Sequence, residues 1–98
     1  MEMICIVDNG KTYRVRKENV GCSIFGSGCF IEGDDVLFDV LKAFAQEDVE
    51  EEYRGLLKTY QVEERILKRD LWELAIEFEK QQIFEELAVK IRKVVGGI

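Results

Sequence analysis

The sequence predicts an α+β fold in which two N-terminal β-hairpins form a small antiparallel sheet and a C-terminal helical layer packs on it, with a long last helix. Two observations carry the sheet: glycine-containing turns at Asn9-Gly10 and Gly26-Ser27 separate short segments rich in β-branched and aromatic residues. A third observation predicts the helices. Between Gly55 and Gly96 the chain runs without any Gly or Pro and is dense in good helix formers.

The length of the chain predicts one domain. Ninety-eight residues are close to the size at which a monomer buries roughly two-thirds of its unfolded surface and stands alone with little to spare. We therefore expect a single domain over residues 1–98, with hairpins in 1–33 and helices in 36–95. A partner subunit would add to its stability.

The first hairpin has a predictable register, because Asn-Gly is the favoured pair of a type I′ turn. Asp8 should face Lys11 across it. The first strand then offers Met3, Cys5 and Val7 on its second face, so we expect it to be covered on both sides and the second strand to lie nearer an edge. A partner subunit is one candidate for this cover. The expected pairs are Ile6 with Tyr13, Ile4 with Val15, Cys5 with Arg14 and Met3 with Arg16.

The second hairpin is expected to turn at Gly26-Ser27, with glycine in the first position of a type II′ turn. This places four side chains on one face: Cys22, Ile24, Cys29 and Ile31. All three cysteines of the chain, the third being Cys5, are expected to act as small core residues. Gly33 ends the sheet, and a helix follows from Val36 with Asp35 or Asp39 as its N-cap.

The rest of the chain predicts further helix, with two to four helices in the helical region as a whole. Acidic residues at 48–52 precede this further helix and match the positive end of its dipole. Two apolar stripes follow, Leu67-Leu71-Leu74-Phe78 and Phe84-Leu87-Ile91-Val94. Six residues separate Phe78 from Phe84 where seven would continue the seam, so the helix should bend or restart around residues 80–82.

The residue types needed for catalysis are sparse. The chain has no histidine, its glycine cluster lacks the Lys and Ser or Thr of a Walker A loop, and its three cysteines show no C-x-x-C spacing. We therefore expect no catalytic residue, no metal site and no cofactor. A small thiol-dependent enzyme using Cys22 or Cys29 is kept as an alternative.

The charge distribution opposes nucleic-acid binding as the main function. The net charge of −6 arises entirely in residues 1–55, which hold twelve acids and six bases. One basic cluster occurs, on the second strand. The cluster consists of Lys11, Arg14, Arg16 and Lys17. It could contact nucleic acid, protect a sheet edge or pair with the acidic segment 48–52.

One family resemblance bears on that alternative. A glycine-acid turn and a helix follow a hairpin at Ile31-Glu32-Gly33-Asp34-Asp35-Val36-Leu37-Phe38-Asp39-Val40-Leu41-Lys42-Ala43-Phe44. This arrangement is similar to the non-catalytic N-terminal domain of archaeal tRNA-splicing endonucleases. It covers at most the first half of the chain, and the nuclease domain with its catalytic histidine has no counterpart. The resemblance implies an accessory role in RNA processing.

The leading hypothesis rests on surplus apolar helix surface. The helical half carries more large apolar side chains than one narrow stripe needs, which favours a protein interface. We expect a non-enzymatic interaction protein, a homodimer or small subunit, with no membrane span. The start of the chain lacks a signal-peptide pattern, which predicts a cytoplasmic protein, and the abundance of Glu, Lys and Arg hints at a thermophilic source. The candidate contact residues are Trp72, Phe78, Phe84 and Leu87.

Overall fold

The computed structural model describes residues 2–26 and 28–96 and confirms the α+β class. An antiparallel sheet of four strands, in the order β1-β2-β3-β4, is followed by four helices. The chain divides into two compact units. We call them the sheet unit, residues 1–42, and the helical unit, residues 43–98.

The first hairpin has the predicted register. β1 (Met3–Asp8) and β2 (Lys11–Lys17) pair with Asp8 opposite Lys11 and Ile6 opposite Tyr13. Asn9 and Gly10 occupy the turn with positive φ angles of 51° and 76°, as an Asn-Gly type I′ turn requires. The face that carries Ile6, Tyr13 and Val15 is buried and forms the core side of the sheet.

The expected positions of the first two strands in the sheet are wrong. β2 also pairs with β3 (Cys22–Gly26), so β2 is a central strand and β1 is an edge strand. The basic residues of β2 suggested edge protection, but Arg14 and Arg16 lie on the solvent-facing side of the sheet, where charged side chains are also tolerated, and Lys11 and Lys17 lie at the two ends of the strand. Residues 2–26 and 28–96 do not cover the second face of β1, since Met3, Cys5 and Val7 are exposed, so a cover supplied by a partner subunit stays a prediction.

The second hairpin is shifted by two residues from its expected register. Gly26 remains in the strand and pairs with Cys29 of β4 (Cys29–Gly33), so that Ile24 lies opposite Ile31. Gly26 also pairs with Tyr13 of β2, and this pairing extends β3 beyond the predicted turn. A shift of two residues preserves the faces, because side chains alternate with a period of two.

Helix α1 (Asp35–Phe44) follows directly after the sheet. Its cap is Asp34, whose Oδ1 accepts a hydrogen bond from the Leu37 amide at 2.8 Å, so the expectation of Asp35 or Asp39 as the cap is wrong. Asp35 is instead the first helical residue and has another partner. Phe38 and Leu41, three residues apart on one face of the helix, are buried.

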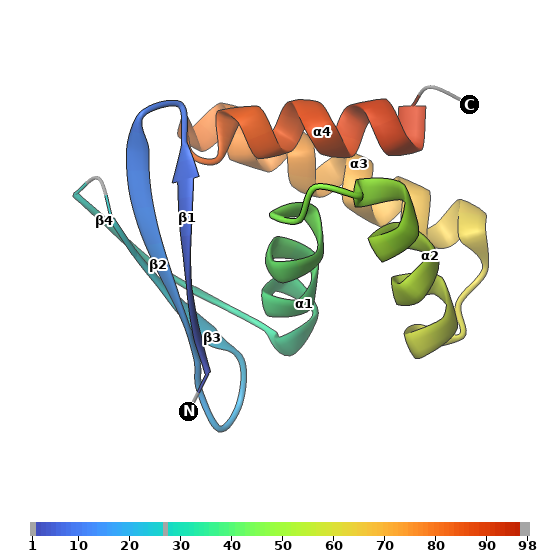
Figure 1. Cartoon of the computed structure of the whole chain (residues 1–98), viewed down its shortest axis with the longest axis horizontal. Helices are drawn as coiled ribbons and strands as arrows, with labels where there is room; N and C mark the ends of the chain where they lie inside the picture. The colour runs from blue at the N-terminus through green and yellow to red at the C-terminus, as the bar shows by residue number, and fades with distance from the viewer. Residues whose placement is uncertain (1, 27, 97–98) are drawn as a thin grey trace. The chain divides into compact units, whose positions relative to one another are not determined.

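The helical unit contains three helices. α2 (Val49–Tyr60) begins at Asp48, whose Oδ1 accepts a hydrogen bond from the Glu51 amide at 3.2 Å. The unit continues with α3 (Glu64–Gln81) and α4 (Glu85–Gly96), which lie side by side (Figure 1). Their buried faces follow the two predicted stripes, except that Ala75 and Val95 are buried where Leu74 and Val94 are only half-buried.

The predicted interruption between the two stripes is confirmed. α3 ends at Gln81, and Gln82 adopts the left-handed conformation with φ 59° while its amide bonds back to the Glu79 carbonyl at 3.2 Å. Phe84 also has a positive φ of 49° and precedes α4 directly. Two such residues within three positions turn the chain sharply enough for α4 to return along α3.

Candidate functional site

The sheet presents one face to solvent, and this face is unusually apolar. Met3, Val7 and Phe30 expose 55%, 71% and 58% of their surface. A solvated face of an antiparallel sheet normally carries polar side chains. We call this surface the outer sheet face; its members are Met3, Cys5, Val7, Thr12, Arg14, Arg16, Phe25, Phe30 and Glu32.

Two phenylalanines and an arginine form the ordered centre of the outer sheet face. Phe25 and Phe30 lie opposite one another across β3 and β4, with ring centroids 5.0 Å apart and planes tilted by 53°. The guanidinium carbon of Arg16 lies 5.5 Å from the centroid of Phe25. Arg14 is the cross-strand neighbour of Phe25 and of Cys5. The arrangement offers aromatic faces beside cationic groups, a combination that protein and nucleic-acid interfaces both use.

Arg16 is held in place by Glu18. Its Nε lies 2.9 Å from Oε1 of Glu18, and the same oxygen accepts a hydrogen bond from the Ser23 hydroxyl at 3.0 Å. Together, the Ser23 hydroxyl and the Arg16 guanidinium lower the pKa of the Glu18 carboxyl. The charge of Arg16 is therefore compensated locally and its guanidinium is positioned over the ring.

The predicted basic cluster does not act as one set of free cations. Lys17 forms an ion pair with Asp35 and lies 5.6 Å from the centroid of the Phe38 ring, away from the outer sheet face. Arg16 is paired with Glu18. Among residues 2–26 and 28–96, Lys11 and Arg14 have no ion-pair partner, so two of the four cations are available to a ligand.

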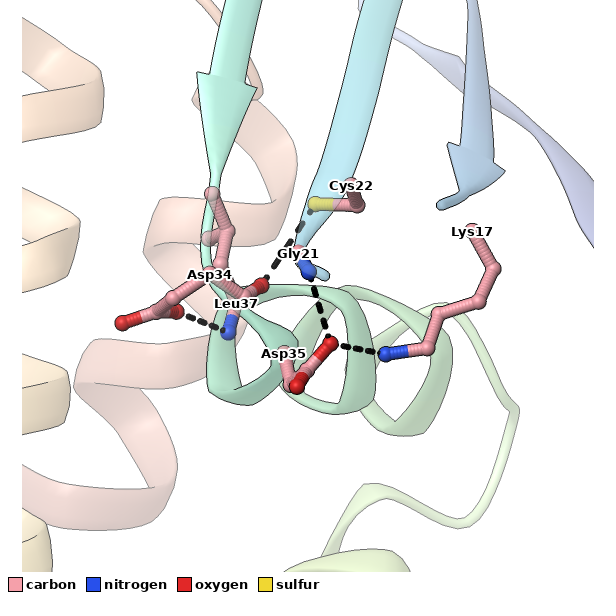
Figure 2. A network of polar contacts seen from close by, with 6 residues as sticks. All are labelled: Lys17, Gly21, Cys22, Asp34, Asp35 and Leu37. Carbon is pink, nitrogen blue, oxygen red and sulfur yellow. Dashed lines mark hydrogen bonds and ion pairs between the residues drawn. The ribbon is translucent and has the colours of Figure 1, made fainter. Parts of the chain in front are cut away.

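The pair of Lys17 and Asp35 belongs to a polar network at the start of α1 (Figure 2). The Asp35 carboxylate accepts a hydrogen bond from the Gly21 amide at 2.9 Å as well as its contact with Lys17. The Lys17 ammonium and then the Gly21 amide lower the pKa of Asp35, and the carboxylate in turn raises the pKa of Lys17. This network fastens the loop between β2 and β3 to the helix, which is a structural role.

The cysteines are divided between core and surface. Cys22 is buried, and its Sγ lies 3.6 Å from the Asp34 carbonyl oxygen; burial raises the pKa of its thiol, which opposes its use as a nucleophile. Cys5 and Cys29 are exposed, so the expectation that all three are core residues is wrong. Within residues 2–26 and 28–96 the cysteines form no disulfide, and no acid or cysteine cluster there could hold a metal ion.

The structure separates the four predicted helical contact residues. Phe78, Phe84 and Leu87 are buried inside the helical unit, and the rings of Phe78 and Phe84 lie 5.2 Å apart. Trp72 exposes 40% of its surface on α3. The spacing that grouped these residues reflects the core between α3 and α4, and Trp72 is the member that reaches the surface.

Trp72 is the centre of a small surface patch on the helical unit. The Arg92 guanidinium carbon lies 5.0 Å from the centroid of the indole, and Arg92 Nε lies 3.0 Å from Glu79 Oε1. Gly96 lies against the other part of the ring, since a Cβ there would be 2.6 Å from the indole. Trp72, Arg92 and the exposed Val89 line a shallow, open depression.

Comparisons with known proteins add no homologue. No family model matches the chain, and neither a curated protein nor a solved structure gives a match. Among the described residues, no helix has both the length and the apolar character that a membrane crossing demands.

The pair of Phe25 and Phe30 was not among the expected contact residues, although its face could be predicted. Both residues alternate with the core side chains Ile24 and Ile31, which places them together on the opposite face in either register. The direct contact between the two rings depends on the two-residue shift in the register of the second hairpin, which the sequence does not predict. The apolar residues Met3, Cys5 and Val7 on the second face of β1 indicate the same surface.

Proposed function

We propose that this protein is a non-enzymatic interaction subunit that functions as a homodimer. The observation that carries the proposal is the exposed apolar character of the outer sheet face, with Met3, Val7 and Phe30 more than half exposed. Met3 and Val7 lie at the β1 edge of this face and Phe30 at the β4 edge. Exposed apolar side chains on one face of a sheet favour a protein interface.

The size of the apolar contribution supports a two-fold assembly. Full burial of one large apolar side chain is worth about 1.5–3 kcal/mol. Each side chain of a two-fold interface is buried twice, once on each copy. Burial of all three side chains on both copies would supply at most about 9–18 kcal/mol, and less once the part already buried in one copy is subtracted, which is comparable with the association cost of about 4–15 kcal/mol. Further contacts must add to it, and the positioned Arg16 and Phe25 are suited to that role.

The Trp72 patch is a second candidate contact on the helical unit. Tryptophan and arginine are the residue types most often found at the energetic centre of protein interfaces. Arg92 and Gly96 hold the Trp72 ring in place, so little side-chain entropy would be lost on binding.

The test of the homodimer is its mass in solution by light scattering over a dilution series. Val7→Lys should shift the protein toward monomer, because it places a charge on the apolar surface of β1. Val20→Lys is the matched control, since Val20 is 88% exposed in the loop between β2 and β3 and carries the same substitution. A wild-type protein that is monomeric at every concentration would overturn the proposal.

A second candidate function, accessory binding of single-stranded nucleic acid, is favoured by one observation. Arg14 lacks an ion-pair partner among residues 2–26 and 28–96 and lies beside Phe25, so aromatic stacking and a free cation coincide on the outer sheet face. The net charge of −6 opposes it. Binding of a single-stranded oligonucleotide that weakens steeply with salt and is lost in Arg14→Gln would support this function.

A further inference from the structure

The edge strand β1 offers a second, more specific contact than the outer sheet face. β2 pairs with one side of β1, and no strand in the described part of the chain pairs with the other side. Strand pairing within the described sheet does not use the backbone amides and carbonyls on that side, so a further strand can pair there. A strand added there would gain main-chain hydrogen bonds as well as side-chain contacts.

β1 lacks the features by which edge strands usually avoid such pairing. Natural edges are protected by lysine, proline, bulges or shortness. The run from Met3 to Val7 contains only apolar residues and cysteine, and its pairing with β2 is regular over all six residues of the strand. β4 at the other edge is shorter and carries Glu32 and Gly33. This difference between the two edge strands favours β1 as the strand that pairs with a further strand.

The sequence of β1 is complementary to itself in one antiparallel register. Two copies related by a two-fold axis perpendicular to the sheet keep their faces, so an outer residue must lie opposite an outer residue. With Cys5 opposite Cys5, Met3 faces Val7 and Ile4 faces Ile6, and all pairs from Met3 to Val7 are apolar or thiol.

Neighbouring registers are less favourable. An axis through Ile6 places Ile4 opposite Asp8, and an axis through Ile4 places Glu2 opposite Ile6. The Cys5 register does bring Glu2 opposite Asp8 at the two ends of the ladder. Glu2 is already paired with Lys42 of α1 in the same copy, which offsets this repulsion.

We propose that the homodimer forms by antiparallel pairing of β1 with β1 of a second copy, centred on Cys5, to give one continuous sheet. This inference rests on the proposed homodimer and names its interface, which involves Met3 and Val7; Phe30 lies on β4 at the opposite edge of the sheet and stays outside this contact. Met3 and Val7, exposed in a single copy, pack against each other across the axis. The main-chain hydrogen bonds supply the association energy that the side chains alone leave short.

Oxidative cross-linking of the full chain tests the register, in a Cys29→Ser background that removes the other exposed thiol. Directly opposite residues of an antiparallel pair have Cα atoms about 4.5–5.5 Å apart, within the Cα separation of about 4.4–6.8 Å that a disulfide spans. Diamide should therefore convert the protein to a covalent dimer, and Cys5→Ser should abolish it. The matched control moves the thiol by two residues, with Cys5→Ser and Val7→Cys together, because the two Val7 positions would be separated by about 13 Å along the strand.

The outcomes separate the two proposals. Cross-linking through Cys5 and not through Val7→Cys supports the β1 interface. A dimer by light scattering that cross-links only through Val7→Cys, or through neither position, overturns the β1 register and leaves the homodimer standing. A monomer by light scattering without cross-linking at Cys5 overturns both.

Discussion

Gly26 lies so close to Thr12 that a Cβ on the glycine would be 2.3 Å from the Thr12 carbonyl oxygen. The glycine also has a φ of 150°, which side chains rarely allow. This contact lets β3 continue alongside β2 past the point where a turn was expected. It therefore determines the register of the second hairpin and the contact of Phe25 with Phe30.

Gly26→Ala should destabilise the protein more than Gly28→Ala. Gly28 also has a positive φ, of 77°, but an added Cβ would meet no atom within 4 Å, so only the backbone cost of roughly 1–2 kcal/mol applies. At Gly26 the clash is with backbone that cannot move aside, and the loss should reach about 3 kcal/mol, the upper end of the usual range. Urea unfolding followed by circular dichroism measures both variants, and equal losses would contradict the structure at β3.

The sequence was sufficient to predict the first hairpin, because Asn-Gly leaves one favoured turn and alternation then assigns every pair. It was insufficient for the second hairpin, because Gly26-Ser27-Gly28 allows the turn to begin at either of two positions. The difference depends on the non-local pairing of Gly26 with Tyr13. A shift of two residues leaves each side chain on its predicted face of the sheet. The outer sheet face could therefore be predicted from the sequence, whereas the contact between Phe25 and Phe30 could not.

The candidate contact residues on the helices show a different limit. Apolar spacing predicted the stripes and the break between them, but it cannot distinguish a helix face that packs inside the chain from one that binds a partner. Phe78 and Phe84 contact each other within the helical unit. Trp72 lies off the Leu67-Leu71-Phe78 stripe in the helical pattern, and this offset is what brings it to the surface.

The three cysteines should label in two classes. Cys5 and Cys29 are exposed and should react quickly with a thiol reagent at neutral pH. Cys22 should react only on unfolding, because it is buried and its raised pKa keeps the thiol protonated. Labelling followed by mass spectrometry, with and without urea, checks this order, and fast native labelling of Cys22 would revive a thiol-based activity. Protection of Cys5 at high protein concentration alone would agree with the β1 interface.

Asp35→Asn should remove a pH-dependent part of the stability. The pKa of Asp35 is lowered in the folded protein, so its contribution is present above the unfolded value of about 4 and is lost as the pH falls through the folded value. The pKa of Lys17 is raised, so the same pair weakens again only when the pH rises past about 10.4.

The free energy of unfolding of wild type and Asp35→Asn should therefore differ between these limits and converge at acidic pH. The Asn side chain can still accept the hydrogen bond from the Gly21 amide, so the substitution isolates the charge. Urea titrations at pH 3 to 8 measure the difference. A difference that is independent of pH would mean that the ion pair with Lys17 does not form in solution.

Phe84→Ala should mainly lower the stability of the fold, whereas Trp72→Ala should mainly weaken association. The Phe84 ring is fully buried against Phe78, and its loss should cost about 3–5 kcal/mol. Alanine at this position keeps the positive φ of the backbone, so the measured loss reports the ring. Trp72→Ala should cost roughly 1–2 kcal/mol, since much of the indole is already in water and its loss chiefly removes the contacts with Arg92 and Gly96.

Both variants are compared at one protein concentration, because the stability of a dimer depends on it. If the Trp72 patch contributes to association, Trp72→Ala should raise the dissociation constant of a protein that remains folded, whereas Phe84→Ala should unfold the helical unit first. Circular dichroism and light scattering on the same samples distinguish the two. A Phe84→Ala protein that keeps its stability and loses only association would place Phe84 at an interface and contradict its burial in the core.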